Sequence, residues 1–194
     1  MLLKTVQLAD QEIYVFDLEI ADNQRYRRRA LLDHALTDYF FDHEQVSYIY
    51  HQAGKSAQLR LEPLMLQTLA SDKPSQDDYC LAISYALPLV AVTWAKDKLA
   101  VDMCRVNAFE QMTDIEMQQF CQLYLPELLQ QDINSSTLAK HWCIYEAKLK
   151  YLGLALQEYS ADLQQKLANL AVQSVQTGQY WLSLVQSAER KLLI

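Results

Sequence analysis

Hydrophobic and polar residues alternate along the first part of the chain and then adopt a helical spacing. The alternation over residues 6–20 predicts β-strands, and a further strand is expected at 45–51. Residues 25–41 lie between these segments, and their apolar positions predict a helix: Leu31, Leu32, Ala35, Leu36 and Tyr39. Residues 59–63 fit a strand and 64–70 fit a helix.

Three β-rich runs fill residues 79–103, with turns at Leu87-Pro88 and at 96–98. We expect these runs to form an antiparallel meander. The pattern then becomes helical. Thr113 is the expected N-cap of a helix to about residue 123, because Glu116 completes a capping box.

The remaining elements include the longest predicted helix of the chain. Pro126 should begin a short helical segment, and Ser136 should cap a longer helix that carries residues 142–153. After Gly153 the chain should stay helical or loop-like to about residue 167. Residues 170–175 and 180–186 predict a final hairpin around the turn at 177–178. Strands, helices, strands, helices and strands in this order indicate an α+β fold.

An acid and a base lie one helical turn apart in the longest predicted helix. At about 100° per residue, one face carries its apolar side chains: Trp142, Tyr145, Leu149, Leu152 and Leu156. Glu146 then falls at the border between core and solvent, with Lys150 just beyond it. A surface ion pair, contributing about 0.2–0.5 kcal/mol to the helix, would explain the same spacing.

A second acid, Asp102, closes an apolar run that begins at Leu99, and we expect it at a strand end. By itself it could be a turn or edge acid. Together, Asp102 and Glu146 could hold one Mg²⁺, which usually takes one or two carboxylates and leaves its other positions to water and phosphates.

Five short blocks in a fixed order carry a resemblance to a known family. The blocks are Arg29-Ala30-Leu31-Leu32, Asp72-Lys73-Pro74, Ser84-Tyr85-Ala86, Ala100-Val101-Asp102 and the segment 142–153. In this order they resemble the 4′-phosphopantetheinyl transferase superfamily, which includes the surfactin-synthetase-type enzymes and the holo-acyl-carrier-protein synthases. The helical block, with its Glu-Ala-x-x-Lys pattern, is the most specific of the five.

Three positions depart from the family pattern. Cys104 stands where larger members have a metal-binding Glu, and a thiol is a poor ligand for Mg²⁺. Tyr145 replaces the first Lys of the helical motif, and Tyr85 replaces a His. Either Tyr could donate a hydrogen bond to a phosphate, but neither brings a positive charge.

The resemblance implies an α+β fold of two similar α/β lobes, related by a pseudo-twofold axis, with the cofactor cleft between them. Residues 1–98 would form the N-terminal lobe, and 99–194 the C-terminal lobe with the metal and the motif helix. It also implies Mg²⁺-dependent transfer of phosphopantetheine from coenzyme A to a serine of an acyl- or peptidyl-carrier protein.

The same resemblance assigns roles to individual residues. Asp102 and Glu146 would bind the metal, with Cys104 a doubtful ligand, and Lys150 would complete the catalytic group and neutralise a phosphate. Coenzyme A would be met by residues of both lobes: Arg29, Lys73, Ser84, Tyr85 and Lys150. Arg25, Arg27 and Arg28 next to Arg29 could also serve the carrier, or form a solvated run of charge.

Composition restricts the alternatives. The 194 residues include three glycines and neither common phosphate-loop motif, so phosphates would have to be bound by cationic side chains. The net charge of −7 argues against nucleic acid as a partner. No apolar run reaches the ~20 residues of a membrane span.

The N-terminus does not resemble a secretory signal, and the four cysteines show no CxxC spacing, so we expect free thiols and a cytoplasmic location. A two-lobed chain would need no partner subunit to complete a cleft between its lobes, so we also expect a monomer. Two other readings of the chain stay open. It could be a relative that binds coenzyme A or a carrier protein without transfer, or an acidic, helix-rich adaptor whose motif is coincidental.

Overall fold

The chain divides into two compact units. In a computed structural model, the described residues are 1–19, 25–39, 46–53, 56–63, 78–95 and 97–186. Unit 1 is Met1–Lys98 and unit 2 is Leu99–Ile194. The division falls at the same residue as the expected boundary between the lobes. Within the described ranges, no helix is long and apolar enough to cross a membrane.

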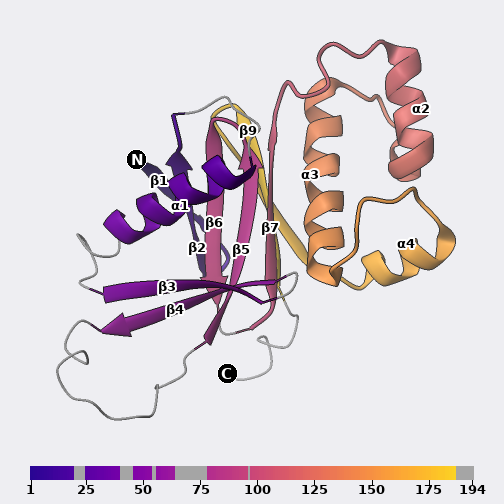
Figure 1. The fold of residues 1–194 in the computed structure, drawn as a ribbon. Coiled ribbons are helices and arrows are strands. Elements are labelled where there is room, and N and C mark those ends of the chain that lie inside the picture. Colours follow the sequence, from indigo (N-terminus) through magenta and orange to yellow (C-terminus); the bar gives the residue numbers. More distant parts are fainter. Residues whose placement is uncertain (20–24, 40–45, 54–55, 64–77, 96, 187–194) are drawn as a thin grey trace. The chain divides into compact units, whose positions relative to one another are not determined.

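In its described residues, unit 1 combines one helix with a six-stranded antiparallel sheet (Figure 1). The strand order in the sheet is β1-β2-β6-β5-β4-β3. Its elements are β1 Leu2–Leu8, β2 Gln11–Asp17, α1 Arg25–Tyr39, β3 Val46–Ala53, β4 Ser56–Pro63, β5 Asp78–Ala86 and β6 Leu89–Ala95. Helix α1 contributes two fully buried side chains, Leu32 and Leu36, to a core with Phe16 of β2 and Val90 and Val92 of β6.

Most of the elements predicted for unit 1 are confirmed. The alternating N-terminal segment is the β1–β2 hairpin, the Arg-rich segment is α1, and the expected strands near 45–51 and 59–63 are β3 and β4. The helix predicted at 64–70 lies outside the described residues.

The prediction of a three-stranded meander is wrong for its third strand. Strands β5 and β6 do form an antiparallel hairpin, but β6 has its other edge paired with β2. With both edges of β6 occupied, β7 (Leu99–Arg105) has no place beside it and pairs with β9 (Tyr180–Gln186). The chain therefore leaves the first sheet between Ala95, the last residue of β6, and Leu99, the first residue of β7.

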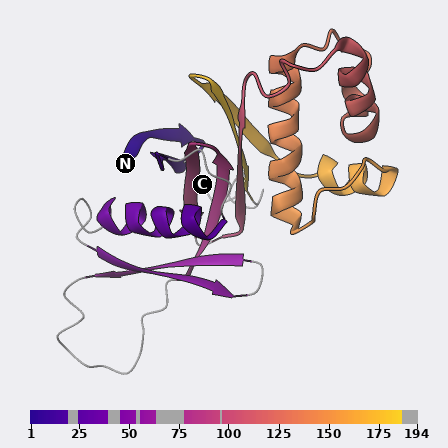
Figure 2. The same cartoon turned by 45° about the horizontal axis from the view of Figure 1, so that its top comes forward.

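Unit 2 packs helices on a small antiparallel sheet of strand order β7-β9-β8. Its other elements are α2 Asp114–Tyr124, the 3₁₀ turn η3 Pro126–Leu128, α3 Ser135–Leu152, α4 Ala161–Ala168 and β8 Val172–Thr177. Helix α3 lies along β7 and β9, and α2 and α4 lie on the side of α3 away from the sheet (Figure 2). The predicted hairpin of 170–186 is confirmed as β8 and β9.

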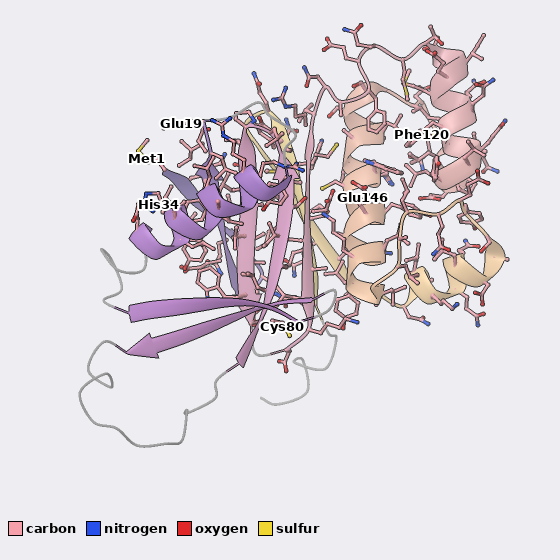
Figure 3. The ribbon with its side chains drawn as sticks, viewed as in Figure 1. Met1, Glu19, His34, Cys80, Phe120 and Glu146 are labelled. Carbon is pink, nitrogen blue, oxygen red and sulfur yellow. The ribbon has the colours of Figure 1, made fainter. Side chains whose placement is uncertain are left out.

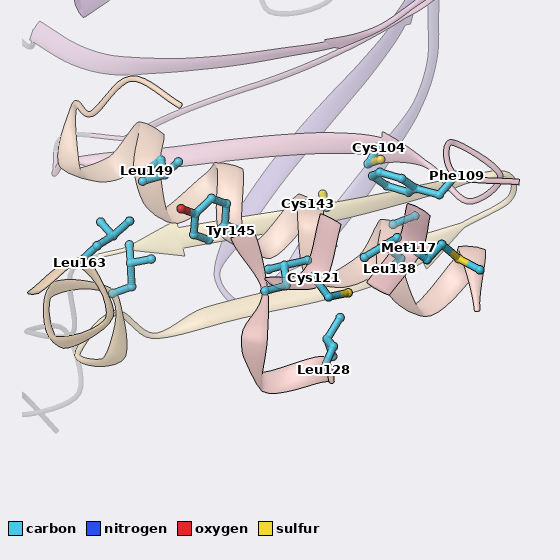
Figure 4. Packing of buried hydrophobic residues seen from close by; sticks show 13 residues of the cluster. Cys104, Phe109, Met117, Cys121, Leu128, Leu138, Cys143, Tyr145, Leu149 and Leu163 are labelled. Atoms are coloured by element: carbon cyan, nitrogen blue, oxygen red, sulfur yellow. The ribbon is translucent and has the colours of Figure 1, made fainter. Parts of the chain in front are cut away.

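The core of unit 2 is formed by buried side chains from all of its layers (Figure 4). Leu138 and Cys143 of α3 and Cys121 of α2 are fully buried within it. Rings on the outer side of α3 meet edge to face, such as those of Phe120 and Trp142, whose centroids are 4.9 Å apart. This packing fixes α3 between the sheet and the outer helices, so side chains on its inner face have little freedom to move.

Local signals determine where the helices of unit 2 begin and end. The Thr113 capping box at the start of α2 is confirmed. Helix α3 begins two residues earlier than expected, because the side chain of Asn134, not Ser136, accepts the backbone N–H of Thr137. It ends at Gly153, whose φ of 71° suits a residue without a side chain.

The fold is α+β, as predicted, with two antiparallel sheets in the described residues. In each unit a helix contributes buried side chains against an antiparallel sheet, which has six strands in unit 1 and three in unit 2. The pseudo-twofold relation between lobes stays a prediction.

Candidate functional site

Asp102 is the buried acid at the centre of the candidate site. It is the middle residue of β7, with its side chain only 2% exposed, so the expectation that it lies at a strand end is wrong. The strand continues to Arg105 because the residues after Asp102 pair in register with β9 as far as Tyr180. A buried ionised carboxylate requires nearby cations or hydrogen-bond donors, since it has lost its water.

Helix α3 supplies the residues that meet Asp102. Glu146 (Figure 3) is half-buried and lies close enough to Asp102 for the charge of Asp102 to act on its carboxyl group. Lys150, one turn further on, donates a hydrogen bond from Nζ to Oδ1 of Asp102 at 2.5 Å. The structure therefore brings together the three residues to which the sequence analysis gave the catalytic roles, all within unit 2. Glu146 and Lys150 do not form a simple surface ion pair, because both lie next to the buried carboxyl group of Asp102.

The charge of Asp102 affects the protonation of its neighbour Glu146. Burial, and then the charge of Asp102, raise the pKa of Glu146 to about 7, while Lys150 acts in the opposite direction. A second ionised carboxyl group beside Asp102 is costly, so Glu146 keeps its proton to a higher pH than an isolated glutamate does. A carboxyl group with a pKa near 7 is suited to accept or donate a proton at physiological pH.

Cys104 lies close to the same carboxyl groups but has different chemistry. Burial raises the pKa of its thiol to about 12, and the charges of Asp102 and Glu146 add to the effect. The group is therefore a neutral thiol at physiological pH, and its Sγ is 3.6 Å from the backbone carbonyl of its neighbour Arg105. A neutral, soft sulfur atom does not suit Mg²⁺.

The two carboxyl groups fit a sparse Mg²⁺ site. Among the described residues, no cluster of three or more His, Cys, Asp or Glu side chains could hold a metal ion. Asp102 and Glu146 alone provide two hard oxygen ligands, the usual protein share of a Mg²⁺ ion that also binds water and phosphate. A divalent cation bound by both groups would neutralise their negative charge and displace the proton that Glu146 retains.

Tyr145 is a structural residue of the helix. It is 4% exposed, and its hydroxyl donates a 2.7 Å hydrogen bond to the backbone carbonyl of Gln157. This bond ties α3 to the segment that follows it. The hydroxyl is thus engaged inside unit 2, and the idea that it could replace the family's Lys at a phosphate finds no support.

The residues expected to bind coenzyme A from the N-terminal lobe belong to unit 1. Ser84 is buried on β5, and Tyr85 is half-buried with the guanidinium carbon of Arg28 5.0 Å from its ring centroid. Arg29 is part of α1. Lys73 lies outside the described residues.

Three polar residues next to Asp102 were not singled out for this site by the sequence. Ser183 is fully buried on β9 directly opposite Asp102, Ser174 on β8 pairs with Ser183, and Cys143 on α3 is fully buried beside them. The signal was present in the sequence, because Ser183 interrupts the apolar run of the last strand. The sequence does not show how the strands pair, so it gave no reason to connect Ser183 with Asp102.

Comparison of the chain with models of known protein families and with curated protein sequences gives no match. The function is therefore argued from the motif and from the geometry of Asp102, Glu146 and Lys150.

Proposed function

We propose that this protein transfers the 4′-phosphopantetheine arm of coenzyme A to a serine of an acyl- or peptidyl-carrier protein, with Mg²⁺ as cofactor. The observation that supports the proposal most is the convergence of Asp102, Glu146 and Lys150. Asp102 and Lys150 are 48 residues apart in sequence, and a chance arrangement of surface charges would not place this acid in the core.

Each of the three residues has a task suited to the reaction. Asp102 and Glu146 would hold the metal ion, which, when bound, neutralises charge on the pyrophosphate of coenzyme A. The ammonium group of Lys150 hydrogen-bonds to Asp102, but the side chain is 40% exposed, so this group could move from Asp102 to a phosphate at the surface. It would stabilise negative charge on the leaving group.

The transfer would be a nucleophilic substitution at phosphorus. The serine oxygen forms a bond to the phosphorus next to the pantetheine arm, and the P–O bond to the second phosphate breaks. The product 3′,5′-ADP leaves with the bonding electrons. Glu146 accepts the serine proton, a role for which a pKa near 7 is favourable.

A second candidate function is binding of coenzyme A or a carrier protein without transfer. Two observations favour it: Cys104 is a neutral thiol where the larger enzymes have an acid, and the Tyr145 hydroxyl is committed to Gln157. At each of these two positions, a group that enzymes of the superfamily use is absent. The reaction above needs neither, because the two remaining carboxyl groups suffice for Mg²⁺.

The mass of a carrier protein distinguishes these functions. Apo-carrier incubated with the protein, coenzyme A and Mg²⁺ should gain the mass of phosphopantetheine. Glu146→Gln should reduce the rate at least about 10²-fold, as expected for loss of a general base. Glu158→Gln is the matched control, because Glu158 is exposed and follows the helix. The binding function would be favoured if the protein binds coenzyme A but the masses of fatty-acid, polyketide and peptide carriers do not change.

A further inference from the structure

Helix α2 carries large apolar side chains on the face that points away from the core of unit 2. Its inner face buries Met117 and Cys121, yet Ile115 is 69% exposed and Leu123 is 44% exposed. At about 100° per residue, Ile115 and Leu123 lie within a quarter turn of each other on the side opposite Met117. They are about 12 Å apart along the helix axis.

A second exposed apolar segment meets the same helix. The backbone N–H of Tyr159 donates a 2.7 Å hydrogen bond to the carbonyl oxygen of Leu123, so the segment after α3 passes the C-terminal end of α2 (Figure 1). Two leucines of this segment are exposed, as is the leucine that follows η3. Together with the two residues of α2 they form what we call the apolar patch: Ile115, Leu123, Leu129, Leu154 and Leu156. Exposed apolar patches of this kind commonly mark interaction sites.

The charges next to the apolar patch are negative. Between Arg105 and Lys140 the chain has no Lys, Arg or His. The same stretch has five acids, all exposed: Glu110, Asp114, Glu116, Glu127 and Asp132. Asp114 and Glu116 also stabilise the first turn of α2, but the other three acids lie outside this helix, so the helix dipole does not explain them.

The lysines in the described part of unit 2 are engaged with other groups. They are Lys140, Lys148, Lys150 and Lys166. Lys140 lies over the ring of Trp181, with Nζ 5.4 Å from the ring centroid, and Lys148 donates a 2.9 Å hydrogen bond to the carbonyl oxygen of Leu167. The other two form ion pairs with acids. The surface complementary to the apolar patch is therefore apolar with basic residues around it.

We infer that the apolar patch binds a basic amphipathic helix of a partner protein. Such a helix presents apolar anchors at i, i+3, i+4 and i+7, which extend over roughly 10 Å, about the length from Ile115 to Leu123. Its Lys and Arg side chains would meet the exposed acids, which favour a basic partner over an acidic one. The inference does not depend on the proposed function, because no residue of the patch belongs to the site around Asp102.

A synthetic peptide tests the inference on the full chain. The probe is a fluorophore-labelled peptide of about 18 residues, long enough to be helical, with Leu at the anchor positions and Lys elsewhere. One control peptide has Glu in place of every Lys, and another has the composition of the probe with its Leu residues spread around the helix. Fluorescence anisotropy should show that both controls bind at least about tenfold more weakly than the probe. Equal binding of the Glu peptide, or no binding of the probe, would overturn the inference.

Variants of the chain locate the binding surface. Ile115→Gln/Leu123→Gln should weaken probe binding at least about tenfold, because it removes two apolar anchors. Leu3→Gln is the matched control, since it removes an exposed leucine from β1 in unit 1 and should bind the probe as the wild type does. Thermal unfolding checks that both variants are folded. Wild-type affinity in Ile115→Gln/Leu123→Gln would contradict the assignment of the patch.

Two further measurements test other occupants of the patch. Sedimentation of the chain alone should show no self-association that Ile115→Gln/Leu123→Gln abolishes. Flotation with phosphatidylserine–phosphatidylcholine vesicles should show no binding, because the acids repel an anionic surface. Self-association lost in that variant would assign the patch to a second copy of the chain, and vesicle binding lost in it would assign the patch to a membrane surface. Either result would overturn the inference.

Discussion

The ammonium group of Lys150 donates a 2.5 Å hydrogen bond to Oδ1 of Asp102, and the proposed function gives the same carboxylate to a metal ion. A lysine and a divalent cation compete for such a carboxylate, because both neutralise the same charge. Metal binding should therefore be accompanied by movement of Lys150 from Asp102 towards a phosphate. Its partly exposed position leaves room for this exchange.

Lys150→Gln should change metal affinity and catalysis in opposite directions. Without the competing ammonium, Mn²⁺ binding to the protein alone should tighten about twofold to fivefold, the value of a partly exposed ion pair. Phosphopantetheine transfer should slow by about 10²-fold, because a group that stabilises charge in the transition state is lost. Calorimetry and carrier mass measure the two effects.

Lys166→Gln provides the control for this pair of measurements. Lys166 forms an exposed ion pair with Asp162 at 2.7 Å within α4, so its loss removes the same charge from unit 2 without touching Asp102. Weaker Mn²⁺ binding in Lys150→Gln than in this control would contradict the competition.

The metal-free protein should lose stability as the pH rises from about 4.5 to 7. Below this range Glu146 is protonated in both the folded and the unfolded chain. Within it, the unfolded chain releases the proton while the folded protein retains it, because the pKa is raised from 4.5 to about 7. The penalty is complete above pH 7 and should be on the order of 1–2 kcal/mol after allowance for solvent screening.

Chemical denaturation in the presence of a chelator measures this trend. Glu146→Gln should flatten the pH dependence, because glutamine does not titrate. An unchanged slope in Glu146→Gln would show that other groups cause the trend.

The start of α3 offers a test that distinguishes sequence pattern from structure. Asn134→Ala should lower the free energy of unfolding by about 1 kcal/mol, since the Asn134 side chain accepts the N–H of Thr137. Ser136→Ala should have an effect within about 0.5 kcal/mol, because Ser136 lies inside the helix. Urea denaturation compares the two variants, and a larger effect at Ser136 would contradict the observed cap.

The local pattern of residues was sufficient to predict most helices and strands of the fold. The capping box at Thr113 and the β8–β9 hairpin follow from chemistry between neighbouring residues, and the structure has them where they were expected. The pairing of β7 was not predictable in this way. Sequential strands often pair, but β7 joins a strand of the C-terminal segment because β6 has no free edge.

Prediction of the site from the sequence was limited in the same way. The spacing of Glu146 and Lys150 indicated a helix edge facing a ligand, and Asp102 stood out as an acid in an apolar run. Ser183 and Cys143 were not connected with them, because their relation to Asp102 depends on strand register and on how α3 lies over the sheet. Leu156 was placed on the apolar face of the helix, but the chain turns at Gly153 and leaves it exposed.

The central claim is that Asp102 and Glu146 share one divalent ion. Mn²⁺ titration of the wild type, Asp102→Asn, Glu146→Gln and the double variant, followed by electron paramagnetic resonance with coenzyme A present, tests it most directly. We predict one bound ion per wild-type chain, a large loss of affinity in each single variant and little further loss in the double variant. Wild-type affinity in either single variant, or fully additive losses in the double variant, would contradict a shared ion.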